Sequence, residues 1–425
     1  MTPYEQGMSH LAEFGLGELQ IERMLGGFAD AMHGPLAEAQ RSIVLSNDPA
    51  RSSVEPHFIV IPDIDTLKRI GGIPDARFQS AGWEDSLPKP LAATPGMLAA
   101  AQPHSKDICA ALYAYVYGDS SKVTDYRDSL NRLRFPMKVA VFAAENVVVT
   151  RENPLIIEDA EGHDNPVSLV FGKVTIMPGG QIIWKTTGKL FCDSMEVVAG
   201  ESGQLGEDPT PNLSSVGGNG GNGGNGSDGG KGNDGNDGQA GKDNKNSCAQ
   251  GATNGTDGTD GTDGSPGQDG AKGADGGPVN QDIGSMGGHY VLSSQGGNGG
   301  NGGKGGNGGD GGKGGKGGAS TSHCGAGKGG DGGNGGNGAM GGNGGNGGNG
   351  MSVYITYSGG NPTFTNVSRG GDGGTGGTAG NGGAGGASGT GSPPGTKGQK
   401  GSASDAATPG EAGKAGSVHV NGIPI

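Results

Sequence analysis

Apolar residues recur at helical spacing in the first third of the chain. Residues 1–34 carry such a stripe, which predicts a helix. Two further helices are predicted over residues 105–117 and 121–133. The proline-rich stretch between the first helix and these two predicts only a short strand, residues 58–61. We therefore expect residues 1–136 to form a mainly helical N-terminal region.

The pattern changes at Met137, where short runs of β-forming residues begin, with turn formers such as Asn165 and Pro166 between them. The runs follow one another at a spacing of about ten residues, which is typical of a small β-sandwich or a few coils of a β-solenoid. We favour the solenoid for residues 137–200, because its open end could continue directly into the next region. The predicted strands are residues 139–142, 147–150, 155–157, 167–171, 174–177, 181–184 and 195–198.

After a linker at residues 201–216, the chain adopts a repeat of three residues. Residues 296–319 read GGN GGN GGK GGN GGD GGK GGK GGA. This period fits neither an α-helix nor a strand, but it fits a polyproline-II-type helix, which has three residues per turn. Two edges of such a helix would be bare backbone, and bare edges can approach one another. We expect a bundle of these polyglycine II helices over residues 217–416, followed by a strand-like tail at residues 417–425.

The glycine-rich region divides into six runs, and their phase argues against a flexible linker. In the fourth run, the non-glycine residues from Lys328 to Asn349 all keep the same third position, which a linker has no reason to do. A collagen triple helix is an alternative, but residues 255–276 hold only one proline. The runs are residues 217–241, 251–277, 296–319, 325–350, 370–391 and 395–416.

Two classes of run appear among the six. Most have the form GGx, with two bare edges, whereas residues 255–276 and 395–416 have the form Gxy, with one bare edge. A run with one bare edge belongs at a margin of the bundle. We expect stability to come from backbone hydrogen bonds between runs, because these runs contain almost no apolar side chains.

Composition narrows the classes of function. Of 425 residues, 99 are glycine, and the net charge of −14 argues against a nucleic-acid partner. The sequence contains no apolar stretch long enough to span a membrane, and the N-terminus lacks the basic start and apolar stretch of a signal peptide. We expect a protein located outside the cell or on a particle, exported without a classical signal peptide.

Chemical motifs are sparse. The evenly spaced Asp257, Asp260 and Asp263 could attract a cation, but a solvated polar edge explains them better. The eight histidines do not cluster, His323 and Cys324 are too few for a zinc site, and no nucleophile–base pair has a credible context. We therefore expect no catalytic residue, metal or cofactor. Cys248 and Cys324 interrupt the glycine runs and have a structural role in this interpretation, either as a disulfide or as two thiols.

The segments between runs are better candidates for recognition. Residues 351–369 predict a β-hairpin, and residues 278–295 carry a second group of apolar residues. Aromatic loops on a rigid frame suit binding, although the same residues could anchor the runs to the N-terminal part. The candidate binding residues are His289, Tyr290, Tyr354, Tyr357 and Phe364.

The GGN and GGx runs broken by short loops resemble two groups of polyglycine-II proteins, the tip adhesins of T4-like phage tail fibres and the glycine-rich antifreeze protein of snow fleas. The resemblance covers residues 217–416. In the phage adhesins, binding specificity lies in the loops between helices. By resemblance, these loops correspond to residues 278–295, 320–324 and 351–369.

These observations predict a multi-domain fold with a helical region, a solenoid-like β region and a polyglycine II bundle. The expected function is that of a non-enzymatic adhesive or structural surface protein. Its partner would be a cell-surface receptor, a polysaccharide or identical subunits. A self-assembling filament or coat subunit is the first alternative, and an ice-binding protein or the host-binding part of a toxin is the next.

Overall fold

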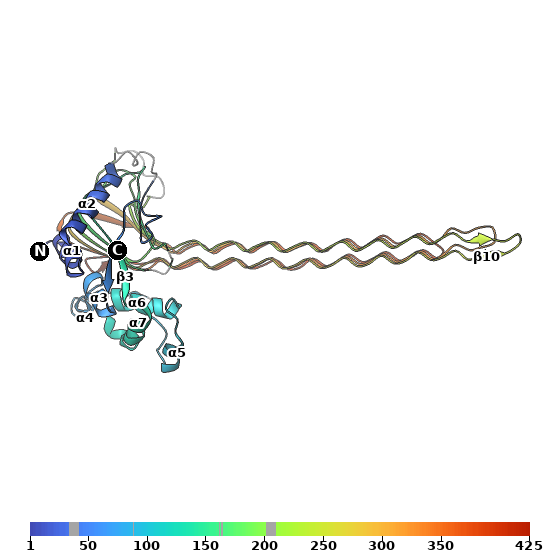
Figure 1. Cartoon of the computed structure of the whole chain (residues 1–425), viewed down its shortest axis with the longest axis horizontal. Helices are drawn as coiled ribbons and strands as arrows, with labels where there is room; N and C mark the ends of the chain where they lie inside the picture. The colour runs from blue at the N-terminus through green and yellow to red at the C-terminus, as the bar shows by residue number, and fades with distance from the viewer. Residues whose placement is uncertain (34–41, 88, 161, 163–164, 201–209) are drawn as a thin grey trace.

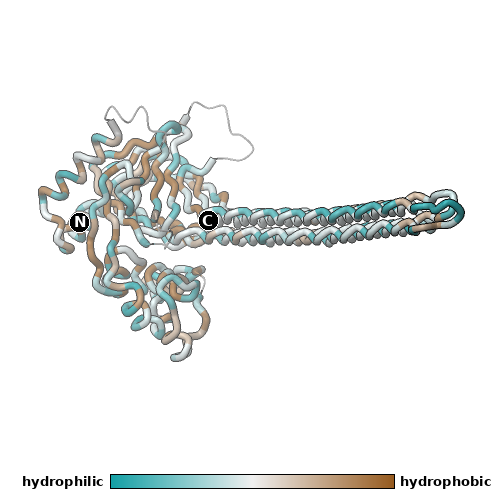
Figure 2. The backbone as a smooth tube through the Cα atoms, turned by 45° about the vertical axis from the view of Figure 1, so that its right-hand side comes forward, coloured by the Kyte–Doolittle hydropathy of each residue, from teal (hydrophilic) through white to brown (hydrophobic). Residues whose placement is uncertain are grey.

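A β-sheet body and a long rod make up the molecule, and both chain termini lie in the body (Figure 1). The structure is a computed structural model that describes residues 1–33, 42–87, 89–160, 162, 165–200 and 210–425. Hydrophobic residues gather in the body, whereas the rod is mostly hydrophilic to neutral, with a few hydrophobic segments near its far end (Figure 2).

Two large sheets form the body, and the chain alternates between them. From β3 to β15, successive strands outside the rod belong to opposite sheets, and neighbouring strands within each sheet are parallel. The six-stranded sheet has the order β1-β4-β6-β8-β12-β14, namely Ile43–Ser46, Leu155–Glu158, Ile182–Trp184, Leu213–Val216, His289–Gln295 and Thr363–Asn366. The eight-stranded sheet has the order β16-β15-β13-β11-β7-β5-β3-β2, namely Ile423–Pro424, Val418–Val420, Val353–Gly360, Val279–Gly287, Gly188–Val197, Val167–Ile176, Met137–Val149 and His57–Ile61.

Apolar side chains fill the space between the two sheets. Phe142, Phe171 and Trp184 are among the largest of them and are almost fully buried. The opposite face of the eight-stranded sheet packs against helices in a second apolar cluster. The helices of the described residues are α1 to α7, namely Pro3–Glu13, Glu18–His33, Ile64–Gly71, Asp75–Gln79, Pro95–Ala100, Lys106–Tyr117 and Arg127–Arg134. Of these, α4 does not join the second cluster, because its Phe78 packs with Ile73 and Tyr354 in a small third cluster.

Three glycine-rich hairpins leave the body from one sheet and return to the other. Each outgoing run follows a strand of the six-stranded sheet (β8, β12 or β14), and each returning run leads into a strand of the eight-stranded sheet (β11, β13 or β15). Together the hairpins form the rod (Figure 1). Numbered along the chain, runs 1 to 6 are residues 217–241, 251–277, 296–318, 325–350, 370–391 and 395–416.

Backbone hydrogen bonds between runs hold the rod together. Runs 1, 3 and 5 lie parallel in one layer, where for example the Gly220 N–H donates to the Asn298 carbonyl at 2.8 Å. Runs 2, 4 and 6 form the other layer, and contacts between layers are antiparallel, as in the 2.8 Å bond from Gly297 to Ala274. Runs 3 and 4 each bond to four other runs and are the interior of the rod. Each layer thus continues one sheet of the body.

Glycine is required where two runs approach most closely. A Cβ atom added at Gly220 would lie 2.1 Å from the carbonyl oxygen of Ala271, a distance that no side chain can adopt. Its neighbour Gly221 faces open space, with nothing within 4 Å of an added Cβ. The two glycines of a run 1 triplet therefore differ in whether they tolerate a side chain. In the interior run 3 neither tolerates one, because a Cβ atom added at Gly302 or Gly303 would lie 1.8 or 1.9 Å from a carbonyl oxygen.

Asparagine and aspartate supply a second set of bonds at the remaining position of many triplets. The Asn222 side-chain oxygen accepts the Asn301 N–H at 2.9 Å, and Asn301 in turn accepts the Thr375 N–H at 2.9 Å. The other layer repeats this pattern, as where Asp260 accepts the Asn334 N–H at 2.5 Å. Asp257, Asp260 and Asp263 are therefore acceptors for backbone N–H groups, which the sequence analysis did not foresee.

Side chains close both margins of the rod, at the Gxy runs 2 and 6. In run 2, hydroxyl groups such as that of Thr259 accept N–H groups of run 1, at 2.7 Å for Asn233. In run 6, Lys397 takes the position in the triplet that Gly332 has in the neighbouring run 4. A Cβ atom added at Gly332 would lie 2.2 Å from the Gly386 carbonyl oxygen of run 5, which packs against that side of run 4. The Lys397 side chain therefore occupies the place where a further run would pack. Both Gxy runs lie at margins, as their composition predicts.

The predicted fold class is wrong. Regular secondary structure is dominated by the β-sheets, and the glycine runs form neither helix nor strand over most of their length. The structure does not support a bundle of polyproline-II-type helices as the fold class. Residues 137–200 form no separate solenoid-like region, because their strands share sheets with β1 and β2 on one side and β11 to β16 on the other. Residues 1–136 contribute β1 and β2 as well as helices.

Several individual elements match their predictions. The helix at residues 105–117 corresponds to α6 and the strand at residues 58–61 to β2. The predicted helix at residues 1–34 is two helices, broken near Gly15, which has a φ of +88°. Pairs of predicted strands merge into the long β3 and β5. Part of the predicted linker, residues 201–209, lies outside the described residues, and Leu213–Val216 is β8.

Candidate functional site

The far end of the rod brings together three turns that are distant in sequence. We define the distal tip as residues 242–250, 319–324 and 392–394, where runs 1 and 2, 3 and 4, and 5 and 6 are joined. The first turn contains a short antiparallel strand pair, β9 (Lys242–Asp243) and β10 (Cys248–Gln250), and β10 is labelled at the rod end in Figure 1. The tip is the part of the molecule farthest from the body.

A disulfide joins two of the three turns. Cys248 in the first turn is bonded to Cys324 in the second, with Cα atoms 4.9 Å apart. The sequence left the pairing of these cysteines open, and the structure shows them bonded. This bond restrains the end of the rod that no sheet of the body anchors. In contrast, Cys192 of β7 is a free thiol buried in the body, and burial raises the pKa of this thiol to about 12.

Asp243 links the first two turns of the tip through hydrogen bonds. Its carboxylate accepts a hydrogen bond from the Thr321 hydroxyl at 2.5 Å and from the His323 N–H at 3.2 Å. The Thr321 hydroxyl oxygen also accepts the Cys324 N–H at 3.1 Å. These bonds join the first two turns beside the disulfide and give them one shape.

Around this scaffold, the outer residues of the tip are polar and exposed. The whole first turn from residue 242 to 250 is exposed, as are Ser320, Ser322 and His323 of the second turn. The third turn exposes Ser392 and two prolines. The tip therefore offers hydroxyl, amide, imidazole and ammonium groups on a surface without large apolar side chains.

The residues predicted for recognition lie elsewhere, in the body. Tyr290 of β12 and Tyr354 of β13 are both buried, and the Tyr290 hydroxyl donates to the Met195 carbonyl at 2.8 Å. Tyr357 and Phe364 pack against the core between the sheets. His289 is exposed, and its Nδ1 lies 2.8 Å from the Thr363 hydroxyl.

Residues 278–295 and 351–369 therefore do not form free recognition loops. They supply paired strands that anchor the glycine hairpins to the body, which was the alternative that the sequence left open. Of the three predicted loops, only residues 320–324 lie at the tip. Sequence reasoning gave no special weight to residues 242–250, although the interruption of the three-residue period there was the available signal.

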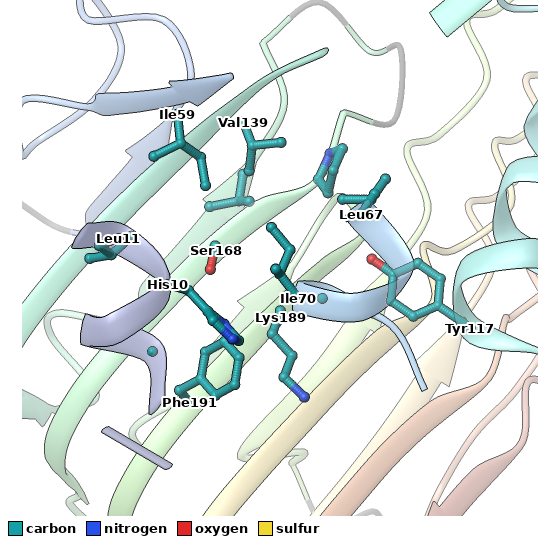
Figure 3. A pocket seen from close by; sticks show the side chains of 14 residues that line it. His10, Leu11, Ile59, Leu67, Ile70, Tyr117, Val139, Ser168, Lys189 and Phe191 are labelled. Carbon is teal, nitrogen blue, oxygen red and sulfur yellow. The ribbon is translucent and has the colours of Figure 1, made fainter. Parts of the chain in front are cut away.

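A small cavity lies beneath α1, between that helix and the eight-stranded sheet (Figure 3). His10, Phe191 and Lys189 border it, and its volume of about 20 Å³ has room for about one water molecule. Lys189 is buried and paired with Asp282, and burial lowers the pKa of both Lys189 and His10. The cavity is too small for a substrate.

Serine hydroxyls surround one buried histidine where the rod meets the body. The Nε2 atom of His419 lies 3.1 Å from the hydroxyls of both Ser86 and Ser417. The His419 ring stacks on Tyr354, with centroids 4.8 Å apart, and burial lowers its pKa. The hydroxyls of Ser86, Ser352 and Ser417 bond to one another here. This cluster therefore holds the loop that carries Ser86 against the strands β13 and β15.

The described residues form neither a metal-ligand cluster nor a membrane-spanning helix. Within the described part of the chain, no three His, Cys, Asp or Glu side chains are grouped as metal ligands. No helix among the described residues is both long enough and apolar enough to cross a membrane.

Comparison with known proteins gives little. No protein-family model matches the chain, and no curated protein matches it, so nothing there supports the resemblance to phage tail-fibre adhesins. Among solved structures, the chain is similar to the nine polyproline type II helical bundle springtail antifreeze protein from Granisotoma rainieri, with 31% identity over 37% of this chain and 93% of that chain. The TM-score is 0.06, which is too low for this likeness to carry an argument.

Proposed function

We propose that this protein is a non-enzymatic adhesive or receptor-binding protein that presents the distal tip to its partner. The observation that carries this proposal is the tip itself. Three exposed turns, distant in sequence, meet at the end of a long rod. The Cys248–Cys324 disulfide and the Asp243 hydrogen bonds fix the first two turns together, and backbone bonds between Ser392 and Gly327 and between Gly329 and Pro393 hold the third turn to run 4. Loops held by a rigid scaffold are the usual place for binding residues.

The construction of the rod supports a role in presentation. Backbone bonds run between runs in both layers, and the Asn and Asp side chains add further bonds along each layer. Such dense cross-linking makes the rod a stiff spacer, whereas an isolated glycine chain would be a flexible coil. A stiff spacer fixes both the distance and the direction of the tip relative to the body.

The disulfide supports a location outside the cell or on a particle. Disulfides persist in oxidising surroundings and are rare in the reducing cytosol. A surface partner, such as a receptor or a polysaccharide, fits a tip that is polar and exposed.

Binding by the tip can be tested with substitutions that leave the rod intact. The tip variant replaces four exposed side chains with alanine: Asn244, Asn246, Ser320 and Ser322. A matched control replaces four exposed side chains of the shaft with alanine: Thr375, Thr378, Asn381 and Ser402. Binding of the labelled full-length protein to a panel of intact cells and immobilised glycans should fall for the tip variant alone. Equal binding by the tip variant and the wild type would contradict the proposal.

Self-assembly through the rod is the alternative function, and the margins of the rod argue against it. The hydroxyls of run 2 already bond to run 1, and side chains, including those of Lys397 and Lys400 at the outer end, occupy the place beside run 6 where another run would pack. Side chains of this kind on exposed edges prevent edge-to-edge association. No other observation favours a filament or coat.

A further inference from the structure

Charge is distributed unevenly between the end of the rod and the rest of the molecule. A single cross-section of the rod is marked by bonds from Thr259 to Asn233, from Gly333 to Gly312 and from Gly398 to Gly386. The outer part beyond it, residues 233–259, 312–333 and 386–400, carries seven lysines and five aspartates, a net charge of +2 in a chain of net charge −14. The basic lysines are Lys242, Lys245, Lys313, Lys316, Lys328, Lys397 and Lys400.

The acidic groups of this outer part are already engaged by the protein. Asp234, Asp237, Asp257 and Asp331 each accept a backbone N–H of a neighbouring run, and Asp243 is bonded within the tip. The bond from the Thr396 N–H lowers the pKa of Asp331, and the bond from the Lys313 N–H lowers that of Asp234, which keeps both ionised. Their oxygen atoms therefore have less capacity left for an outside ligand.

The ammonium groups, in contrast, are available. Among the described residues, none of the seven lysines belongs to an ion pair, whereas the shaft lysines Lys231 and Lys272 pair with Asp234 and Asp275. All seven are exposed. Serine hydroxyls and asparagine amides lie among them at the tip. The outer end of the rod thus offers several unpaired cations spaced among neutral hydrogen-bonding groups.

We propose that the ligand of the tip is an acidic polysaccharide, whose carboxylate groups contact these lysines and whose hydroxyl groups bond to the serine and asparagine side chains. The inference deepens the proposed function and rests on it. A repeating acidic chain meets several lysines at once, so that individually weak contacts add up through multivalency.

The chemistry of the tip favours this class of ligand over other anionic partners. Residues 233–259, 312–333 and 386–400 contain no Phe, Tyr or Trp, and the single imidazole of His323 cannot stack the successive bases of a nucleic-acid strand. The same absence of large apolar side chains leaves nothing to insert into a lipid surface or to form the apolar centre of a protein interface.

The test measures binding of the full-length protein to polygalacturonate, with dextran as a neutral polysaccharide of comparable hydroxyl content. We expect binding to polygalacturonate alone, weakening as salt is raised from 50 mM to 500 mM, because salt screens exposed charges. The variant with Lys242→Gln and Lys245→Gln should bind about fourfold more weakly, at about twofold for each exposed pair lost. A control with Lys304→Gln and Lys414→Gln removes the same charge from the shaft and should leave binding unchanged.

Three results would overturn the inference: no binding to polygalacturonate, equal losses in the tip and shaft variants, or stronger binding to duplex DNA or to vesicles of phosphatidylserine and phosphatidylcholine. Binding to cells separates this inference from the proposed function. Cell binding that is lost in the alanine tip variant but retained in the lysine variant would leave the proposed function standing and remove the acidic polysaccharide.

Discussion

In the body, side chains fill the space between two sheets, whereas in the rod, backbones pack directly against one another. The body relies on buried aromatic and aliphatic groups such as Phe142 and Trp184. Interior runs of the rod bury almost no side chain and instead satisfy their N–H groups with carbonyls and Asn or Asp oxygens of neighbouring runs. The parallel order of the strands can therefore continue beyond the hydrophobic core, because glycine has no side chain that would keep neighbouring backbones apart.

Removing a large core side chain should have the greatest effect, and it should be confined to the body. Phe142 is fully buried between the sheets, and Phe142→Ala should lower the free energy of unfolding by about 3–5 kcal/mol. The loss should appear in thermal unfolding followed by near-ultraviolet circular dichroism. A loss below about 0.5 kcal/mol, the usual range for exposed sites, would contradict the described core.

Two adjacent glycines offer the sharpest test of the rod. Gly220→Ala would place a methyl group 2.1 Å from the Ala271 carbonyl oxygen, so the neighbouring run must move, at a cost of about 1–3 kcal/mol. Gly221→Ala enters open space and should be neutral or slightly stabilising. Limited proteolysis of the rod against temperature should separate the two variants. If the two variants are equally stable, Gly220 and Gly221 do not differ in their surroundings, which would contradict the described packing of run 1 against run 2.

The bonds that Asn and Asp side chains accept from neighbouring runs, which we call the ladder, predict a smaller effect on the stability of the rod. Asn301→Ala removes the acceptor for the Thr375 N–H and should destabilise the rod by about 1 kcal/mol. Lys304 stands at the next such position of the same run without offering an acceptor, so Lys304→Ala should change stability by less than about 0.5 kcal/mol. The same proteolysis assay compares them. An equal effect of both changes would remove the ladder from the account.

Acid should weaken the rod slightly, through aspartates of the ladder. Bonds from backbone N–H groups lower the pKa of Asp234 and Asp331 in the folded rod. The stability that these groups contribute is therefore present above the ordinary aspartate pKa and is lost as pH falls through the lower folded value. Rod stability measured between pH 7 and pH 2 should decline below about pH 4. Asp331→Asn keeps an acceptor and should reduce the decline, while a rise in stability on acidification would contradict the assignment.

The sequence predicted local features better than their combination. The three-residue phase located all six runs, and the Gxy composition placed runs 2 and 6 at the margins. A short run of β-forming residues located β4, and apolar residues at helical spacing located α6. The shared sheets could not be predicted, because pairing β11 with β7 joins residues about ninety positions apart across a whole glycine hairpin, and local periodicity contains no information on such pairing.

The candidate site was predicted less well. Aromatic residues near turns suggested exposed loops, but Tyr290 and Tyr354 face the interior, where burial of aromatic surface outweighs their polar hydroxyls. The tip could not be predicted from the sequence, because its residues form no recognisable motif and become neighbours only when the hairpins align. The Cys248–Cys324 bond depends on the same alignment.

Amide hydrogen exchange of the glycine runs, resolved residue by residue by NMR, tests the central claim most directly. In run 3, the N–H groups of Gly302, Gly303 and Lys304 all have partners in neighbouring runs and should exchange slowly. In run 5, the Gly374 N–H is bonded to Gly345, whereas that of Gly373 has no partner among the described residues, so protection should alternate along this run. Slow exchange throughout run 3 with a three-residue pattern in run 5 is the predicted result. Uniformly fast exchange across both runs would contradict a rod held together by backbone hydrogen bonds between runs.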